Sequence, residues 1–247
     1  MEISLIALAI PPLLLVPAMG LLSRIECKRD FSGELRRKAL HVGTGLFALS
    51  FPLYLTDPWM VLTALGAVIV WMIAVRHLAV LRYRFGSCLH DTKRKSFGEI
   101  YFALSIASLM LLTADRPLLF AIPLLVLTLA DSAAAIVGRL VPMGRLSGLA
   151  SGKTISGCIA FVVVAFVVTQ TIVAAFTAMP VSQTIEVALV VACLTCIAEL
   201  VSKRGFDNVL IPAVAYVALL FLNIPQSSGE GTVAQFCRSV SAFVAMG

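Results

Sequence analysis

The stretch LLVLTLADSAAAIVGR, residues 124–139, is an apolar run interrupted by a single carboxylate. Its apolar residues surround the whole circumference of a helix, which is typical of a helix embedded in lipid or protein. A charge at Asp131 costs at least about 2.5–3.5 kcal/mol on membrane insertion unless it faces protein, water or a cation. We therefore interpret Asp131 as functional. The alternative is a packing groove in which the carboxylate pairs with a neighbouring arginine.

The same helix carries a face of small residues. Asp131, Ala134, Ala135 and Gly138 fall on one side of it by helical spacing. Small residues allow another helix or a ligand to approach closely. Close packing, or close ligand binding, is therefore expected along this side.

Apolar runs of this kind recur along the whole chain, in which 60% of residues are hydrophobic and 13% are charged. A membrane-spanning helix needs about 20 such residues. The sequence predicts an all-α, polytopic integral membrane protein whose residues 1–247 form a single transmembrane domain. About eight transmembrane helices are expected, at roughly 2–23, 38–55, 58–78, 98–114, 117–140, 154–179, 183–203 and 207–223.

The basic residues give the orientation of these helices. The net charge is +6, and 17 of the 19 Lys and Arg flank the connections after spans 1, 3, 5 and 7, leaving Arg116 and Arg238 on the other side. Basic loops stay in the cytoplasm, so both termini are expected outside. The charge thus fits membrane topology and anionic lipid headgroups, and we expect no nucleic-acid partner. The longer polar loops place the active site at the cytoplasmic face, and residues 224–247 are expected to form an outer tail.

A loop between two predicted spans has the appearance of a phosphate-binding loop. It reads SGLASGKTISG (147–157), but it has one residue too few before Gly-Lys-Thr for a Walker loop and follows a membrane helix. Ser151 or Thr154 can cap the next helix, whose N-terminus favours an anion. Gly152 allows close approach and Lys153 supplies a positive charge. We expect phosphate binding here; the alternative is an ordinary capped loop.

Acidic side chains at the end of the chain provide a candidate metal site. Glu199, Asp207 and Asn208 are expected at the same cytoplasmic level as Asp131. Mg²⁺ prefers such oxygen ligands, often one or two carboxylates together with substrate phosphates. The alternatives are an ion pair between Glu199 and Lys203 four residues later, and capping of the last helix by Asp207 or Asn208.

Two further basic segments border predicted spans. In ELRRKALHVGTG (34–45), Arg37 and His41 share a helix face, so His41 is a candidate for catalysis or phosphate contact; the alternative is a hydrogen-bonded packing residue. In DTKRKSFGEIYF (91–102), Lys95 is a candidate anion contact; the alternative is a topology signal only.

Taken in order, these motifs resemble a known family, the CTP-dependent lipid-alcohol kinases. That family comprises phytol, farnesol and dolichol kinases, with the related CTP-dependent diacylglycerol kinases. RRKALHVGTG is similar to its Arg-Lys-x-x-His motif. The resemblance covers residues 34–215, the expected catalytic core. The remaining motifs are Asp131-Ser-x-Ala-x-x-x-Gly138-Arg139, Ser151-Gly-Lys-Thr154-x-x-Gly157, Glu199 and Asp207-Asn208.

The central segment also resembles phosphatidate cytidylyltransferase. That family carries a later Asp-Arg-x-Asp signature, whereas the corresponding region here reads ELVSKRGFDNVLIP (199–212) and lacks it. The difference favours the kinase branch, and the chain length fits the phytol kinase class.

The resemblance implies phosphorylation of an isoprenoid alcohol by CTP with Mg²⁺. The alternatives are CDP-lipid synthesis, a diacylglycerol kinase and, from a different class, a transporter with Asp131 and Glu199 as a relay. Membrane lipids, the lipid alcohol and the nucleotide are the expected partners. The sequence leaves open the identity of the alcohol, the preference for CTP over ATP, the general base and the oligomeric state. Expected catalytic residues are Asp131, His41 and Glu199; expected metal ligands are Asp131, Glu199, Asp207 and Asn208; expected phosphate contacts are Lys153, Thr154, Gly152, Ser151, Gly138, Arg139, Lys95, Arg37 and Lys38.

Overall fold

The computed structural model describes residues 2–23, 32–78, 81, 97–113, 116–147 and 152–225. Each of the eight stretches predicted as spans is helical, which confirms the all-α class. The helices are α1 (Glu2–Ser23), α2 (Ser32–Ala48), α3 (Pro58–His77), α6 (Gly98–Leu112), α7 (Pro117–Leu125), α8 (Asp131–Leu140), α9 (Ile155–Phe176), α10 (Val181–Val201) and α11 (Asp207–Phe221), with a 3₁₀ turn at Phe51–Leu53 and a π-helical turn at Val126–Ala130.

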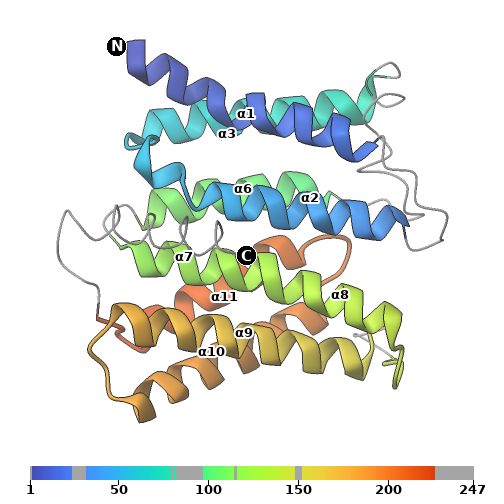
Figure 1. Ribbon diagram of the computed structural model, residues 1–247, viewed down its shortest axis with the longest axis vertical. Helices are drawn as coiled ribbons and strands as arrows, with labels where there is room; N and C mark the ends of the chain where they lie inside the picture. Colours follow the sequence, from blue (N-terminus) through green and yellow to red (C-terminus); the bar gives the residue numbers. More distant parts are fainter. Residues whose placement is uncertain are drawn as a thin grey trace.

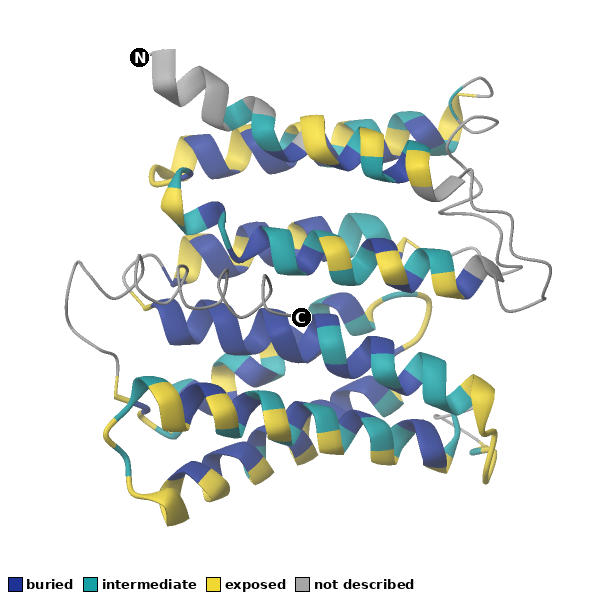
Figure 2. Ribbon diagram, viewed as in Figure 1, coloured by how far each residue is buried: buried dark blue, intermediate teal, exposed yellow. Residues whose placement is uncertain are grey.

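The helices lie side by side in successive layers (Figure 1). Helix α1 packs on α3, and α3 packs on α6. Helix α11 contacts α6, α7 and α10, while α9 lies against both α8 and α10. The continuous helical run from α7 to α8 therefore occupies the middle of the bundle, and its α7 part is buried on all sides (Figure 2).

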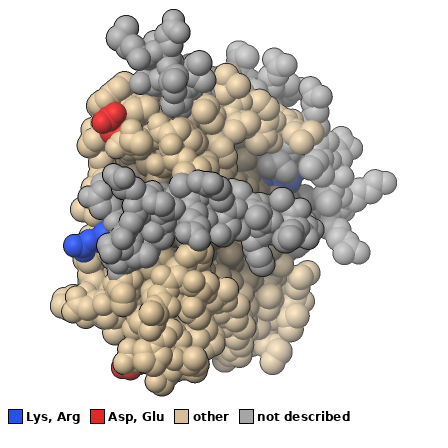
Figure 3. Space-filling view, turned by 60° about the vertical axis from the view of Figure 1, so that its left-hand side comes forward, with Lys and Arg blue, Asp and Glu red and all other residues tan. Residues whose placement is uncertain are grey.

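Several of these helices have the length and apolar surface of membrane spans. Among the described residues, Pro58–His77, Pro117–Leu140, Ile155–Phe176 and Val181–Val201 are long and apolar enough to cross a bilayer. Helix α9 exposes Ile159, Val163 and Val167 at four-residue spacing, and uncharged residues dominate the described surface in Figure 3. The protein is therefore a multi-pass membrane protein. The count of eight crossings and the orientation of the termini stay predictions.

Helix α2 begins earlier and ends earlier than the predicted span 38–55. It starts at Ser32 because its first turns are polar and stabilised by an ion pair between Glu34 and Arg37, whereas hydropathy marks only the apolar part. It ends at Ala48, four residues before Pro52, whose ring disfavours a further helical turn because it clashes with the carbonyl group of Ala48. The polar start of α2 consequently belongs to the site described below.

A π-helical turn, Val126–Ala130, precedes Asp131 in the central helical run. It follows Pro123, a residue that lacks the amide hydrogen needed for regular α-helical bonding. Gly45 of α2 packs so closely on this turn that a Cβ atom there would overlap the side chain of Thr128. This close approach places α2 directly beside the start of α8.

The predicted small-residue face of α8 is confirmed as a helix contact. A Cβ atom on Gly138 would lie 2.7 Å from Oγ1 of Thr154, and one on Gly157 would lie 3.0 Å from the backbone oxygen of Ala134. Helices α8 and α9 therefore approach each other through glycine, as expected for small residues in membrane helices.

Candidate functional site

Asp131 lies in a buried charged cluster between α8 and α2. Its Oδ2 atom accepts a hydrogen bond from Nζ of Lys38, and both residues are buried. The Nε2 atom of His41 lies 4.0 Å from the same carboxylate oxygen. The partner of Asp131 is thus a lysine from another helix, and the neighbouring-arginine alternative is wrong.

His41 has a ring nitrogen without a hydrogen-bond partner among the described residues. That atom, Nε2, is buried. When the ring is neutral with its proton on Nδ1, Nε2 carries a lone pair. The ring also packs on Phe102, with centroids 4.2 Å apart. Nε2 can therefore accept a proton when His41 is neutral.

Glu34, which the sequence analysis missed, joins the ends of α2 and α8. Its carboxylate lies 2.6 Å from Nη2 of Arg37 and 3.3 Å from Nη2 of Arg139. Burial raises the pKa of Glu34, but the charge and hydrogen bond of Arg37 and the charges of Lys38 and Arg139 outweigh burial and lower it below its ordinary value. The spacing of three residues between Glu34 and Arg37 is the signal that could have identified it.

Lys153 and Glu199 form a second ion pair, between the start of α9 and the end of α10. Nζ of Lys153 lies 2.6 Å from Oε1 of Glu199 and also donates to the backbone oxygen of that residue. The alternative in which Glu199 pairs with Lys203 is wrong in its partner: Lys203 is exposed, and Glu199 pairs with Lys153, which is distant in sequence.

The N-terminus of α9 is capped within the chain. Oγ1 of Thr154 accepts a hydrogen bond from the amide of Gly157 at 3.1 Å, and the amide of Ile155 donates to the backbone oxygens of Met143 and Gly144. Gly152 has a φ of 91°, which favours glycine. The capped-loop alternative therefore accounts for Thr154 and Gly152, whereas the Lys153 side chain takes no part in the cap and pairs with Glu199.

Asp207 begins α11 and connects the two ion pairs electrostatically. The charges of Asp131, Lys38 and Lys153 act on its carboxylate, and those of Asp131 and Asp207 act on Glu199. One polar region thus extends over five helices. We call it the polar site and define it by Lys38, His41, Asp131, Lys153, Glu199 and Asp207.

Two further predicted site residues, Asn208 and Gly138, lie in described helices. Asn208 donates from its side-chain nitrogen to the backbone oxygen of Gly205 at 3.2 Å, whereas its Oδ1 has no hydrogen-bond partner within the described ranges. Gly138 lies in the contact between α8 and α9. Ser151 and Lys95 lie outside the described residues, as does the predicted tail from residue 226 onward.

The carboxylates of the polar site fit a metal only together with other ligands. In the described ranges, no three His, Cys, Asp or Glu side chains form a group that could hold a metal ion. Asp131 and Glu199 are each paired with a lysine. Mg²⁺ is commonly held by one or two carboxylates plus substrate phosphates and water. These residues therefore fit Mg²⁺ that arrives with a triphosphate.

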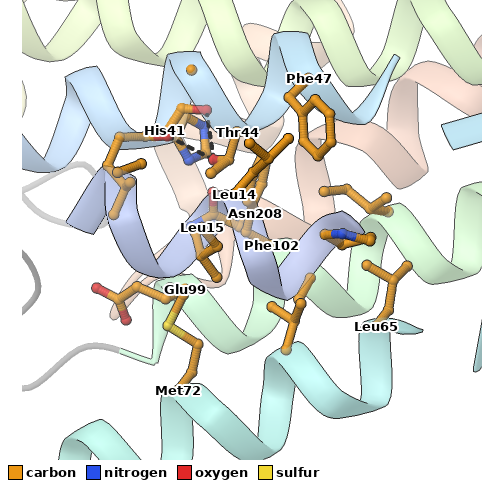
Figure 4. Close-up of a pocket in the computed structure, with 18 of the residues that line it drawn as sticks. Leu14, Leu15, His41, Thr44, Phe47, Leu65, Met72, Glu99, Phe102 and Asn208 are labelled. Atoms are coloured by element: carbon orange, nitrogen blue, oxygen red, sulfur yellow. Dashed lines mark hydrogen bonds between the residues drawn. The ribbon is translucent and has the colours of Figure 1, made fainter. Parts of the chain in front are cut away.

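A cavity of about 430 Å³ lies beside the polar site, lined by α1, α2, α3 and α6 with the start of α11. Its walls are mostly apolar, and its polar lining side chains include His41, Glu99 and Asn208 (Figure 4). Its volume is in the range of small-molecule pockets. This cavity was not predictable from the sequence, because its walls come from separate segments.

Comparison with known proteins identifies a relative. No family profile and no solved structure matches the chain. The chain is 30% identical over 187 residues to the phytol kinase of Synechocystis sp. (strain ATCC 27184 / PCC 6803 / Kazusa), an alignment that covers 72% of this chain and 75% of that protein. This homology supports the assignment of the chain as a kinase and shows that the chain belongs to the phytol kinase family.

Proposed function

We propose that this protein transfers the γ-phosphoryl group of CTP to the hydroxyl group of an isoprenoid alcohol at the cytoplasmic face of the membrane. The observation that carries the proposal is the polar site. A buried Lys38–Asp131 pair lies beside a free nitrogen of His41, within electrostatic range of Lys153, Glu199 and Asp207. Kinship with a phytol kinase supports both the reaction and the class of acceptor.

Lys38 and Lys153 are the cations that we assign to the triphosphate. Each is paired with a carboxylate in this structure, and each can exchange that carboxylate for a phosphate oxygen. Arg37 and Arg139, linked through Glu34, add positive charge nearby. Phosphoryl transfer depends mainly on positioning and charge neutralisation, which these groups supply.

Asp131, Glu199 and Asp207 are the carboxylates that we assign to Mg²⁺. Once Lys38 and Lys153 turn to phosphate oxygens, the carboxylate oxygens of Asp131 and Glu199 become available as ligands. When bound, the metal neutralises charge on the phosphates during transfer. We therefore treat the two ion pairs as the form of the site that precedes nucleotide binding.

His41 is the base that we assign to the acceptor hydroxyl. Asp131 is assigned to Mg²⁺, whereas Nε2 of His41 makes no hydrogen bond among the described residues. The hydroxyl oxygen attacks the γ-phosphorus, the bond from that phosphorus to the bridging oxygen of CDP breaks, and the hydroxyl proton passes to Nε2. Asp131, 4.0 Å away, then stabilises the imidazolium.

Labelled CTP tests this assignment. The purified protein is incubated in liposomes with Mg²⁺, a panel of lipid alcohols that includes diacylglycerol, and CTP labelled on either the γ- or the α-phosphate. A γ-label in a product formed from an isoprenoid alcohol supports the proposal. An α-label in the lipid indicates cytidylyl transfer, preferred labelling of diacylglycerol indicates another kinase class, and absence of label from every alcohol contradicts the proposal. Unlabelled ATP as competitor tests nucleotide preference.

A further inference from the structure

The cavity between α1, α2, α3 and α6 has a shape and lining that suit one part of the acceptor. We propose that it holds the hydrocarbon chain of the isoprenoid alcohol, with the hydroxyl group at the end formed by His41 and Asn208. The inference rests on the proposed function and adds where the acceptor binds and which residues limit its length.

The walls of the cavity are contributed by helices distant in sequence. Leu14 and Leu15 come from α1, Leu65 and Met72 from α3, and Phe102 from α6 (Figure 4). These side chains offer dispersion contacts and no hydrogen bonds, which matches a branched hydrocarbon. A nucleotide base and ribose need many polar partners, so these walls do not suit them.

Two residues that line the cavity each carry a polar atom without a partner. Nε2 of His41 and Oδ1 of Asn208 are both buried, and neither atom hydrogen-bonds to a described residue. Buried polar atoms are nearly always hydrogen-bonded in native proteins. Two such atoms on residues in the walls of an apolar cavity point to a ligand with a small polar head, and a hydroxyl group that reaches them satisfies either one.

The position of His41 makes this end of the cavity continuous with the polar site. His41 lines the cavity, and its Nε2 atom lies 4.0 Å from the Asp131 carboxylate. A chain seated against α1, α3 and α6 therefore presents its hydroxyl at the point where we place the phosphoryl group. Helix α1 thereby becomes a wall of the substrate site in addition to a membrane helix.

Two glycines provide a matched test of the cavity. Gly43 lines the cavity, and a Cβ atom added there meets no atom within 4 Å. Gly66 of α3 is equally open to a Cβ atom but is not among the cavity-lining residues. Gly43→Leu therefore fills the cavity without a backbone clash, and Gly66→Leu is its control.

The kinetic arm compares alcohols of different length. We expect Gly43→Leu to raise KM for a twenty-carbon isoprenoid alcohol about tenfold or more, since it occupies the space of several methylene groups. The KM for CTP and the rate with a ten-carbon alcohol should stay near wild type, as should all parameters of Gly66→Leu. If Gly43→Leu folds poorly, Val68→Phe narrows the cavity from α3. Equal kinetics for the cavity and control variants would overturn the inference.

The binding arm does not depend on catalysis. A twenty-carbon isoprenoid alcohol with a diazirine on its chain is photo-crosslinked to the wild-type protein in liposomes, and the labelled peptides are identified by mass spectrometry. We expect labelling in α1, α3 or α6, competition by the unlabelled alcohol, loss in Gly43→Leu and retention in Gly66→Leu. Labelling elsewhere, or stronger competition by diacylglycerol, would overturn the inference. Labelling of the cavity without phosphoryl transfer would refute the proposed function and leave the cavity assignment intact.

Discussion

The two sides of the bundle are packed differently. On the side of α7 to α11, helices approach through Gly138 and Gly157, and side chains such as Phe161 and Val173 are fully buried. On the side of α1, α2, α3 and α6, the helices line a cavity of about 430 Å³. Helix α2 belongs to both: Gly45 packs tightly on Thr128, while Gly43 faces open space.

This difference separates two tasks that a membrane kinase must combine. Charged groups need fixed positions, and Asp131, Lys153 and Glu199 come from the closely packed side. A hydrocarbon chain needs free volume, which the other side has. The polar site lies where the two sides meet, so substitutions on one side should change charge and stability and those on the other should change acceptor length.

The largest effect is expected at Asp131. Asp131→Asn should lower kcat by about 10²–10³-fold and destabilise the protein by about 3–5 kcal/mol, because Lys38 is left buried without its counter-charge. The measurements are phosphoryl transfer and the thermal unfolding midpoint in detergent. The double variant Lys38→Met with Asp131→Asn should recover much of the stability and none of the activity. Near wild-type activity in Asp131→Asn would remove its assigned role.

Lys153 offers the next largest effect. Lys153→Ala should lower kcat/KM for CTP by about 10²-fold, since a phosphate contact is lost. Lys203→Ala is the matched control, because Lys203 is an exposed lysine just beyond α10. The measurement is kcat/KM for CTP in both variants. A similar, small loss of kcat/KM in the two would show that Lys153 only pairs with Glu199.

Gly157 tests the close packing of α8 on α9. Gly157→Leu should cost about 1–3 kcal/mol of stability, because a Cβ atom there already lies 3.0 Å from the backbone oxygen of Ala134. Gly66→Leu, at an open position, should unfold near the wild-type temperature. Equal unfolding temperatures for the two variants would contradict the contrast between the two sides.

The smallest effect, of opposite sign, is expected at Gly43. Gly43→Ala should stabilise the protein by about 0.4–1 kcal/mol, because alanine restricts the unfolded chain and the position has room for its methyl group. Gly157→Ala should instead destabilise it. The thermal unfolding midpoints of the two variants measure the difference in packing. A loss of stability in Gly43→Ala would show that the cavity wall at Gly43 is tighter than its geometry indicates.

Much of the fold was predictable because hydropathy reports burial in lipid or protein, and all eight predicted stretches are helical. The predicted helix boundaries were wrong where a helix continues into a polar cluster, as at the start of α2. Asp131 was identifiable as functional because a lone carboxylate in an apolar helix is costly. Its partner was not, since Lys38 is 93 residues away and spacing rules reach only one helical turn or two.

The sequence by itself determined the class of protein, the residues able to take part in catalysis or binding, and the order of these residues along the chain. These follow from composition and local spacing. Tertiary structure alone decided that Lys153 pairs with Glu199 and that His41 and Asn208 line a common cavity. The physical reason is that ion pairing and cavity shape depend on how helices far apart in sequence pack together. No local pattern encodes that arrangement.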